Sequence, residues 1–207
     1  YAPTPASRHG LDLRTSADYL VRTYACAMAL GVRVTEWYQF QDGTWFGQRP
    51  RPDDDEYNFG IVYTDLTPKP AYLAYGVLTE QLEGASYVGR LDVGAEDLYA
   101  LRFRRGEGTV DVLWSTREKH ETDVAWWPPE QFKDVFRHPL EPWQERWRAA
   151  VPVALAASGE VVVTELMGTS REVAAADGKV RLELTGSPVY VTGLGEFSVR
   201  PELWLKP

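Results

Sequence analysis

The chain has 207 residues, of which 44% are hydrophobic and 25% charged, which suits one or two globular domains. Residues 1–85 carry 7 basic and 11 acidic side chains and residues 86–207 carry 15 and 19, so each part sums to −4. Neither part has the basic balance that nucleic acid or an anionic membrane surface attracts. No run of roughly 18 apolar residues occurs. We therefore expect neither nucleic acid nor a membrane as a partner.

Cysteine and histidine are sparse. Cys26 is the single cysteine, which excludes an internal disulfide, and its small and apolar neighbours indicate a buried, inert thiol. The three histidines are scattered and have no metal-ligand spacing. We therefore expect no metal site and no cofactor. The sequence leaves both secretion and a cytoplasmic location open.

The first elements are predicted from periodicity. A helix is expected at about 16–30, capped by Thr15 or Ser16 and ended by Gly31. Residues 32–40 alternate and are rich in β-branched and aromatic side chains, which predicts a strand. One face of that strand is apolar, with Glu36 interrupting it: Val32, Val34, Tyr38, Phe40. The other face holds Arg33, Thr35, Trp37 and Gln39.

A long loop is predicted from about 41 to 68, and long loops often carry function. Its acidic run, residues 53–56, lacks the spaced ligands and the glycine of a helix–loop–helix calcium site, so we interpret it as solvated. A second helix is predicted at about 70–83, ended by Gly84. Its expected buried stripe is Leu73, Val77, Leu78 and Leu82.

The pattern changes to short strands after residue 86. Strands are predicted at 87–91, 98–103, 110–114, 151–156, 161–166, 180–184 and 189–191, separated by glycine-containing turns. This spacing favours an antiparallel β-sandwich. An insertion at about 116–149 contains two tryptophan pairs, Trp126/Trp127 and Trp143/Trp147. These either pin the insertion to the sandwich or form a platform for carbohydrate.

The helix–strand–helix unit at 16–83 cannot be a domain, because its single strand has no sheet partner. A complete (β/α)₈ barrel needs roughly 250 residues. The predicted fold class is therefore α+β: the last helix–strand–helix of such a barrel in residues 1–85, then a β-sandwich in residues 86–207. We expect residues 86–207 to fold by themselves. We also expect the apolar face of residues 32–40 to be exposed.

Three stretches carry a resemblance: Val34-Thr-Glu-Trp-Tyr-Gln-Phe-Gln-Asp42, Glu56-Tyr-Asn-Phe-Gly-Ile-Val62 and Asp65-Leu-Thr-Pro-Lys-Pro-Ala-Tyr72. Together they resemble the final barrel segment of retaining (β/α)₈ glycoside hydrolases of the cellulase-like and β-xylosidase/α-iduronidase-like groups. Residues 160–193 also resemble the last strands of the small β-sandwich appended to such barrels. The resemblance implies a carbohydrate substrate and, as a partner, the upstream barrel segment of the parent protein.

The resemblance also implies where the catalytic carboxylates lie. In these enzymes the acid/base follows the fourth strand and the nucleophile ends the seventh, so both are expected outside this sequence. Glu36 and Glu56 are low-ranked alternatives for a pair within it. Their simpler interpretations are a hydrogen-bond acceptor and a loop salt bridge.

The same resemblance implies substrate-binding residues. Trp37 corresponds to an aromatic floor under the sugar, although ordinary core packing also fits it. Asp42 either binds a sugar hydroxyl or braces the loop turn, and Trp45, with Phe46, is a candidate for more distant sugar contacts. Three functions stay open: part of a glycoside hydrolase, a non-catalytic carbohydrate-binding module, or a sandwich that only braces a barrel.

Overall fold

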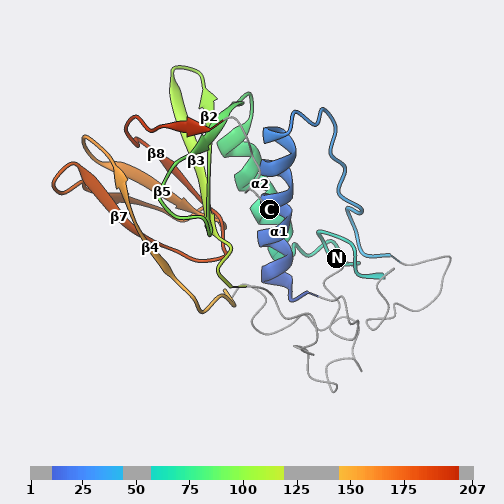
Figure 1. Cartoon of the computed structure of the whole chain (residues 1–207). Coiled ribbons are helices and arrows are strands. Elements are labelled where there is room, and N and C mark those ends of the chain that lie inside the picture. The colour runs from blue at the N-terminus through green and yellow to red at the C-terminus, as the bar shows by residue number, and fades with distance from the viewer. Residues whose placement is uncertain (1–10, 44–56, 119–144, 201–207) are drawn as a thin grey trace. The chain divides into compact units, whose positions relative to one another are not determined.

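The computed structural model describes residues 11–43, 57–118 and 145–200. The chain is mixed α+β, with two helices and largely antiparallel strands (Figure 1). It forms two compact units. The first contains, of the described residues, 11–20, 36–43, 57–75 and 145–146, and the second contains 21–35, 76–118 and 147–200. Each helix contributes to both units, and the expected domain boundary at residue 85 stays a prediction.

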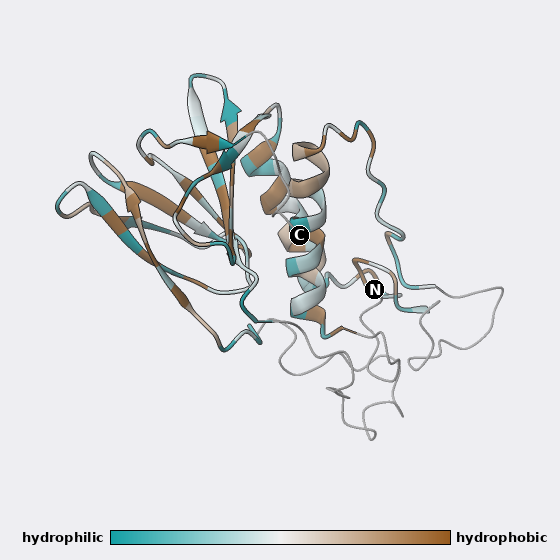
Figure 2. Ribbon diagram, in the orientation of Figure 1, coloured by the Kyte–Doolittle hydropathy of each residue, from teal (hydrophilic) through white to brown (hydrophobic). Residues whose placement is uncertain are grey.

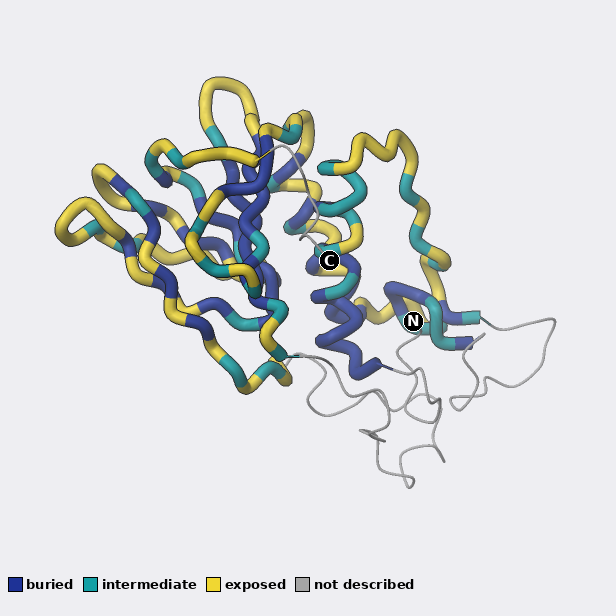
Figure 3. The backbone as a smooth tube through the Cα atoms, viewed as in Figure 1, coloured by how far each residue is buried: buried dark blue, intermediate teal, exposed yellow. Residues whose placement is uncertain are grey.

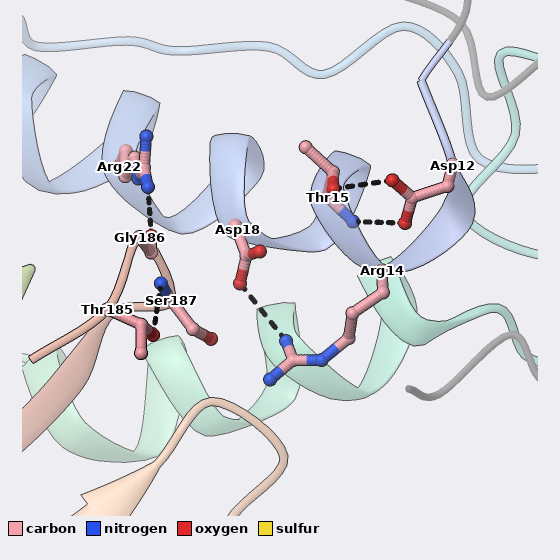
Figure 4. A network of polar contacts seen from close by, with 8 residues as sticks. All are labelled: Asp12, Arg14, Thr15, Asp18, Arg22, Thr185, Gly186 and Ser187. Carbon is pink, nitrogen blue, oxygen red and sulfur yellow. Dashed lines mark hydrogen bonds and ion pairs between the residues drawn. The ribbon is translucent and has the colours of Figure 1, made fainter. Parts of the chain in front are cut away.

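Helix α1 spans Leu13–Ala29 and begins earlier than expected because of its cap. The two carboxylate oxygens of Asp12 accept hydrogen bonds from the Thr15 backbone N–H (2.9 Å) and the Thr15 hydroxyl (2.6 Å), as Figure 4 shows. Asp12 thus satisfies a backbone donor that the first turn leaves free. The predicted caps, Thr15 and Ser16, lie inside the helix instead.

The end of α1 is as predicted. Gly31 has a φ of 71°, a left-handed conformation that glycine adopts at no steric cost. Its N–H donates to the Met28 carbonyl (3.1 Å), and the Val32 N–H donates to the Ala27 carbonyl (2.9 Å). These two bonds form the Schellman arrangement that closes helices.

Helix α2 spans Pro70–Leu82 and begins on a proline, whose missing N–H costs nothing in the first turn. Leu78 and Leu82 are buried as predicted, together with Ala71 and Ala74. The expected burial of Leu73 is wrong, since this side chain is 42% exposed. The buried stripe therefore starts on the small alanines.

Residues 32–40 form no regular strand, which corrects the prediction from their alternation. No backbone hydrogen bond joins residues 33–38 to another described segment, and a strand exists only through such a ladder. The expected exposure of the apolar face is confirmed: Val34 is 73% exposed and Tyr38 60%. Figure 3 shows this stretch after α1 as largely exposed backbone.

Nine strands form the sandwich in the part of the chain that the structure describes. The seven-stranded sheet has the order β6-β5-β8-β3-β2-β1-β9, and β4 pairs with β7 in a second sheet. The bounds are β1 Ser86–Leu91, β2 Leu98–Arg105, β3 Gly108–Ser115, β4 Val151–Ala156, β5 Val161–Glu165, β6 Ser170–Val173, β7 Lys179–Leu184, β8 Val189–Thr192 and β9 Val199–Arg200. All seven predicted strands are present. The sequence analysis missed β6, which is polar, and β9, which has two residues.

The sandwich core is built from alternate residues of the strands. In β4, Val151, Val153 and Leu155 are buried while the residues between them point outward, and β7 alternates in the same way. Figure 2 shows this alternation as brown and teal bands along the strands. One buried cluster joins the two sheets, including Leu91, Leu98, Ala100, Leu113, Leu155, Val163, Val180, Leu182 and Val191.

A buried ion pair links β2 to β3. Arg102 donates two hydrogen bonds of 2.7 Å to the two carboxylate oxygens of Asp111, and a third of 3.0 Å to the Gly195 carbonyl. Asp111 has no exposed surface. Each charge is therefore satisfied by the other, which buried ions require.

The opposite face of the seven-stranded sheet is buried as well. Leu101, Phe103, Val112 and Tyr190 are at most 1% exposed. The last turn of α2, which belongs to this unit, is hydrogen-bonded to the sandwich. Arg105 of β2 donates to two carbonyls of that turn, at 2.6 and 2.9 Å.

Within the same unit, Arg22 and Trp147 connect α1 to the sandwich. Arg22 of α1 donates to the Gly186 carbonyl (Figure 4), and its guanidinium lies 4.8 Å from the centre of the Trp147 ring. A Cβ atom at Gly186 would meet that ring, so only glycine fits there. For Trp147 this packing supports the pinning interpretation. Trp126, Trp127 and Trp143 lie outside the described residues.

Candidate functional site

The first unit contains the region that the sequence singles out. Two short arms, residues 39–43 and 57–62, run side by side, and we call them the strap. Backbone hydrogen bonds join them, among them Gln39 N–H to Phe59 carbonyl (3.0 Å), Val62 N–H to Phe40 carbonyl (3.0 Å) and Asp42 N–H to Val62 carbonyl (3.0 Å). The strap is therefore a defined structure although it has no regular ladder.

The two arms approach too closely for a side chain at one position. A Cβ atom at Gly60 would meet the Asp42 amide nitrogen and, at 2.6 Å, the Val62 carbonyl oxygen. Real Cβ atoms essentially never come so near to backbone atoms. Gly60 is therefore required by the close approach of the arms.

A buried ion pair lies inside the strap. The Lys69 ammonium donates to Asp42 Oδ1 (2.6 Å) and to the Asn58 carbonyl (3.2 Å). Asp42 Oδ1 also accepts a hydrogen bond from the Gly60 N–H (3.0 Å). Lys69 is 2% exposed and Asp42 8%. Asp42 thus braces the loop, which is one of its two predicted roles.

Burial changes the acid–base properties of this pair and of its neighbour. Burial lowers the pKa of Lys69, and the charge of Asp42 and the hydrogen bond to it oppose that change. The Lys69 ammonium lies 5.0 Å from the centre of the Tyr63 ring. Burial, with the nearby carboxylates of Asp42 and Asp65, raises the pKa of Tyr63 well above its usual range.

Aromatic side chains lie on the surface beside the strap. The Tyr38 and Phe59 rings meet edge to face, with centres 5.5 Å apart, and Phe40 meets Tyr72 in the same manner at 6.4 Å. Tyr38 is 60% exposed and Phe40 58%. An exposed ring supplies a flat apolar surface, and aromatic side chains are common in ligand sites for that reason.

The other predicted site residues differ in exposure, and some lie outside the described residues. Trp37 is half-buried and Glu36 is exposed. Trp45, Phe46 and Glu56 lie outside the described residues. The structure therefore brings Asp42 and the exposed aromatic rings into one region and leaves the suggested Glu36/Glu56 pair as a prediction.

Sequence reasoning missed two contributors to this region. Tyr38 was placed on the apolar face that was expected to be exposed, but it was not proposed as a sugar contact, and the structure exposes its side chain more than that of Trp37. Lys69 drew attention only within the Pro-Lys-Pro stretch. It is the only lysine among residues 1–85, and this could have marked it as the partner of a carboxylate in the preceding loop.

Among the described residues, no group of three or more histidine, cysteine, aspartate or glutamate side chains is arranged to hold a metal ion. Neither helix in that part of the chain is long and apolar enough to cross a membrane.

Solved structures that resemble this chain include two glycoside hydrolases. One is a family 39 glycoside hydrolase from the gut symbiont Bacteroides cellulosilyticus WH2, with a TM-score of 0.59 and 21% identity over 86% of this chain and 30% of that chain. The other is a GH30 endoxylanase from Clostridium papyrosolvens C71, with a TM-score of 0.51 and 13% identity over 89% of this chain and 39% of that chain. No protein-family model and no curated protein matches the chain.

The chain thus spans well under half the length of each similar structure. At these identities the likeness concerns fold, and at that level it confirms the resemblance to glycoside hydrolases drawn from the three stretches between residues 34 and 72 and from residues 160–193. The α+β class, with two helices followed by a β-sandwich, is confirmed with it. The chain has the fold of part of a glycoside hydrolase.

Proposed function

We propose that this chain is the C-terminal portion of a glycoside hydrolase that cleaves O-glycosidic bonds of an oligosaccharide or polysaccharide with retention of configuration. The observation that carries the proposal is the fold likeness over 86% of the chain to a family 39 glycoside hydrolase. The order of elements, helices first and sandwich after, agrees with the motif resemblance in residues 17–83.

In this proposal the chain contributes sugar contacts and not the catalytic pair. Retaining hydrolysis needs two carboxyl groups about 5–5.5 Å apart on either side of the scissile bond. Asp42 is already engaged by Lys69 and by the Gly60 N–H, so it is poorly suited to acid–base work. We therefore assign both catalytic carboxylates to the upstream barrel segment of the parent protein.

The sugar contacts are assigned to aromatic rings. Tyr38, because of its exposure, and Trp37, because of the resemblance, are the candidates for stacking under a pyranose ring. The C–H bonds on one side of a pyranose pack on an aromatic surface. Trp45 and Asp42 are weaker candidates, the latter because its carboxylate is buried.

The test is hydrolysis of p-nitrophenyl glycosides by two proteins. One is the 207-residue chain, and the other is the longest open reading frame that contains it. We expect the longer protein to turn over at least one aryl glycoside and to release the retained anomer first, as seen by proton NMR. The chain alone should be inactive. Turnover by the chain alone that Glu36→Gln abolishes would place the catalytic pair within this sequence.

A non-catalytic carbohydrate-binding module is the second candidate, since two aromatic pairs, each with at least one exposed ring, suit binding without chemistry. An upstream sequence unrelated to a barrel, together with glycan binding and no hydrolysis, would favour this function over the first.

A further inference from the structure

The buried ammonium of Lys69 holds together parts of the strap that are distant in sequence. Asp42 comes from the first arm and Asn58 from the second, and Lys69 itself directly precedes α2. The Lys69 N–H also donates to the Ile61 carbonyl (3.1 Å), so the backbone of this residue is anchored to the second arm as well. One side chain thus sets the spacing of the two arms.

This spacing determines where the exposed rings lie. Phe59 stands between Asn58, whose carbonyl receives the Lys69 ammonium, and Gly60, whose N–H binds Asp42. The carbonyl of Phe59 accepts the Gln39 N–H, and its ring meets the ring of Tyr38. A displacement of the second arm therefore moves Phe59 and removes the edge support of Tyr38.

We propose that Lys69 is a positioning residue for the sugar site: through Asp42 and Asn58 it holds Phe59 against Tyr38, so that the Tyr38 ring is preset to stack on a pyranose. The proposal rests on the proposed function. Lys69 does not touch the sugar. It acts through the ring that does, and a preset ring loses less freedom when the sugar binds.

The chemistry of the pair explains why the lysine is needed. A carboxylate buried without its cation is strongly disfavoured, so removal of the ammonium forces Asp42 to move toward water or to take up a proton. Either change disturbs the carboxylate that holds the Gly60 N–H. Lys69→Met removes the charge and keeps an unbranched side chain only one heavy atom shorter, which limits the loss of packing.

The first experiment measures amide hydrogen exchange in the 207-residue chain without ligand. We expect Lys69→Met to accelerate exchange at Gly60, Ile61 and Val62 by on the order of tenfold or more, and to leave Val112 of β3 unchanged. Lys179→Met, at an exposed lysine, is the matched control and should change none of these amides. Unchanged exchange in the strap of Lys69→Met would overturn the proposal.

The second experiment is a double-mutant cycle in the longer protein. Its substrate is the p-nitrophenyl glycoside that the unmodified protein hydrolyses fastest. Lys69→Met should lower kcat/KM by on the order of tenfold to a hundredfold when Tyr38 is present. In a Tyr38→Ala background the same change should cost little, because the ring that Lys69 positions is gone. A merely structural lysine would lower activity equally in both backgrounds, and that result would overturn the proposal.

Two further variants keep the test decisive. If Lys69→Met fails to fold, Asp42→Asn takes its place, because it removes the ion pair from the other side and retains an acceptor for Gly60. Lys69→Arg keeps the charge and should recover part of the activity lost in Lys69→Met. If the unmodified longer protein hydrolyses no glycoside, the proposed function fails and this inference fails with it. If it is active and Lys69→Met is equally active, only this inference fails.

Discussion

The sandwich and the strap are each stabilised internally, and the interactions that do so differ between them. Strands β2 and β3 pair over eight consecutive residues, and the core between the two sheets is made of aliphatic side chains. The strap has irregular hydrogen bonds, one glycine contact that allows no side chain, and a buried lysine–aspartate pair. The sandwich is therefore stabilised by many small contributions, and the loss of one leaves the others in place. The strap depends on a few residues, and no neighbouring contact replaces one that is removed.

The largest expected effect concerns the limits of the sandwich unit. A fragment of residues 86–207 lacks the helix segments that contact the sandwich through Arg105 and Arg22. We expect the buried face with Leu101, Phe103, Val112 and Tyr190 to lose cover in this fragment. Each large apolar side chain that loses its cover costs about 1.5–3 kcal/mol, a substantial part of a domain's total stability. We expect the fragment to melt without cooperativity, measured by circular dichroism against the full chain. A sharp melt would instead support the predicted domain boundary at residue 85.

The second effect breaks the ion pair of the sandwich. Asp111→Ala leaves Arg102 buried without its partner and should lower the free energy of unfolding by about 3–5 kcal/mol, measured by urea denaturation. The matched control is Arg102→Met combined with Asp111→Leu, which replaces both charges by apolar groups and should recover most of that loss. A double variant as unstable as the single one would show that packing at this position, not charge, is what matters.

The third effect is on the rate at which the Cys26 thiol of α1 is alkylated. Burial raises the pKa of the Cys26 thiol from its ordinary value of 9.0 to about 11, while Arg22 opposes the change. At pH 8 the reactive thiolate should thus be about a hundredfold rarer than in the unfolded chain. Alkylation by iodoacetamide should be slower in the native protein by that factor and should accelerate as the pH approaches 11. Equal rates with and without denaturant would contradict this.

The smallest effect separates the observed helix cap from the predicted one. Asp12→Ala removes the acceptor for the Thr15 N–H and should lower the free energy of unfolding by about 1 kcal/mol. Ser16→Ala, at the position suggested by the sequence, should cost clearly less because Ser16 lies inside the helix. The comparison is made by urea denaturation of both variants, and a larger loss for Ser16→Ala would reverse the assignment of the cap.

Periodicity predicted the regular elements well. Both helices and seven of nine strands lie where alternation or helical spacing placed them, because burial of one face imposes those periods on the sequence. The missed β6, with the sequence Ser-Arg-Glu-Val, has little apolar content and is a strand only because β5 offers it hydrogen bonds. Residues 32–40 show the converse case, in which a strand-like alternation finds no ladder.

The candidate site was predicted only in part. Asp42 was singled out by the resemblance, and its bracing role was one of two interpretations, yet its partner was not identified. Lys69 lies 27 residues farther along the chain, and no local pattern links an aspartate to a lysine across a loop. The exposure of Tyr38 was expected with the rest of its apolar face, but its contact with Phe59 was not, because alternation says which side chains share a face and not which ring meets them.

The amino-acid sequence by itself thus determined the order of elements, the end of α1 at Gly31, the core-facing positions of most strands and the likeness to glycoside hydrolases. These features depend on neighbours a few residues away or on a short motif. Only the tertiary structure decided that Asp12 caps α1, that parts of both helices belong with the sandwich, and that Lys69 joins the arms of the strap. Each of these depends on side chains that compete for the same partner or meet across a long loop. Packing in three dimensions determines which of the possible contacts forms.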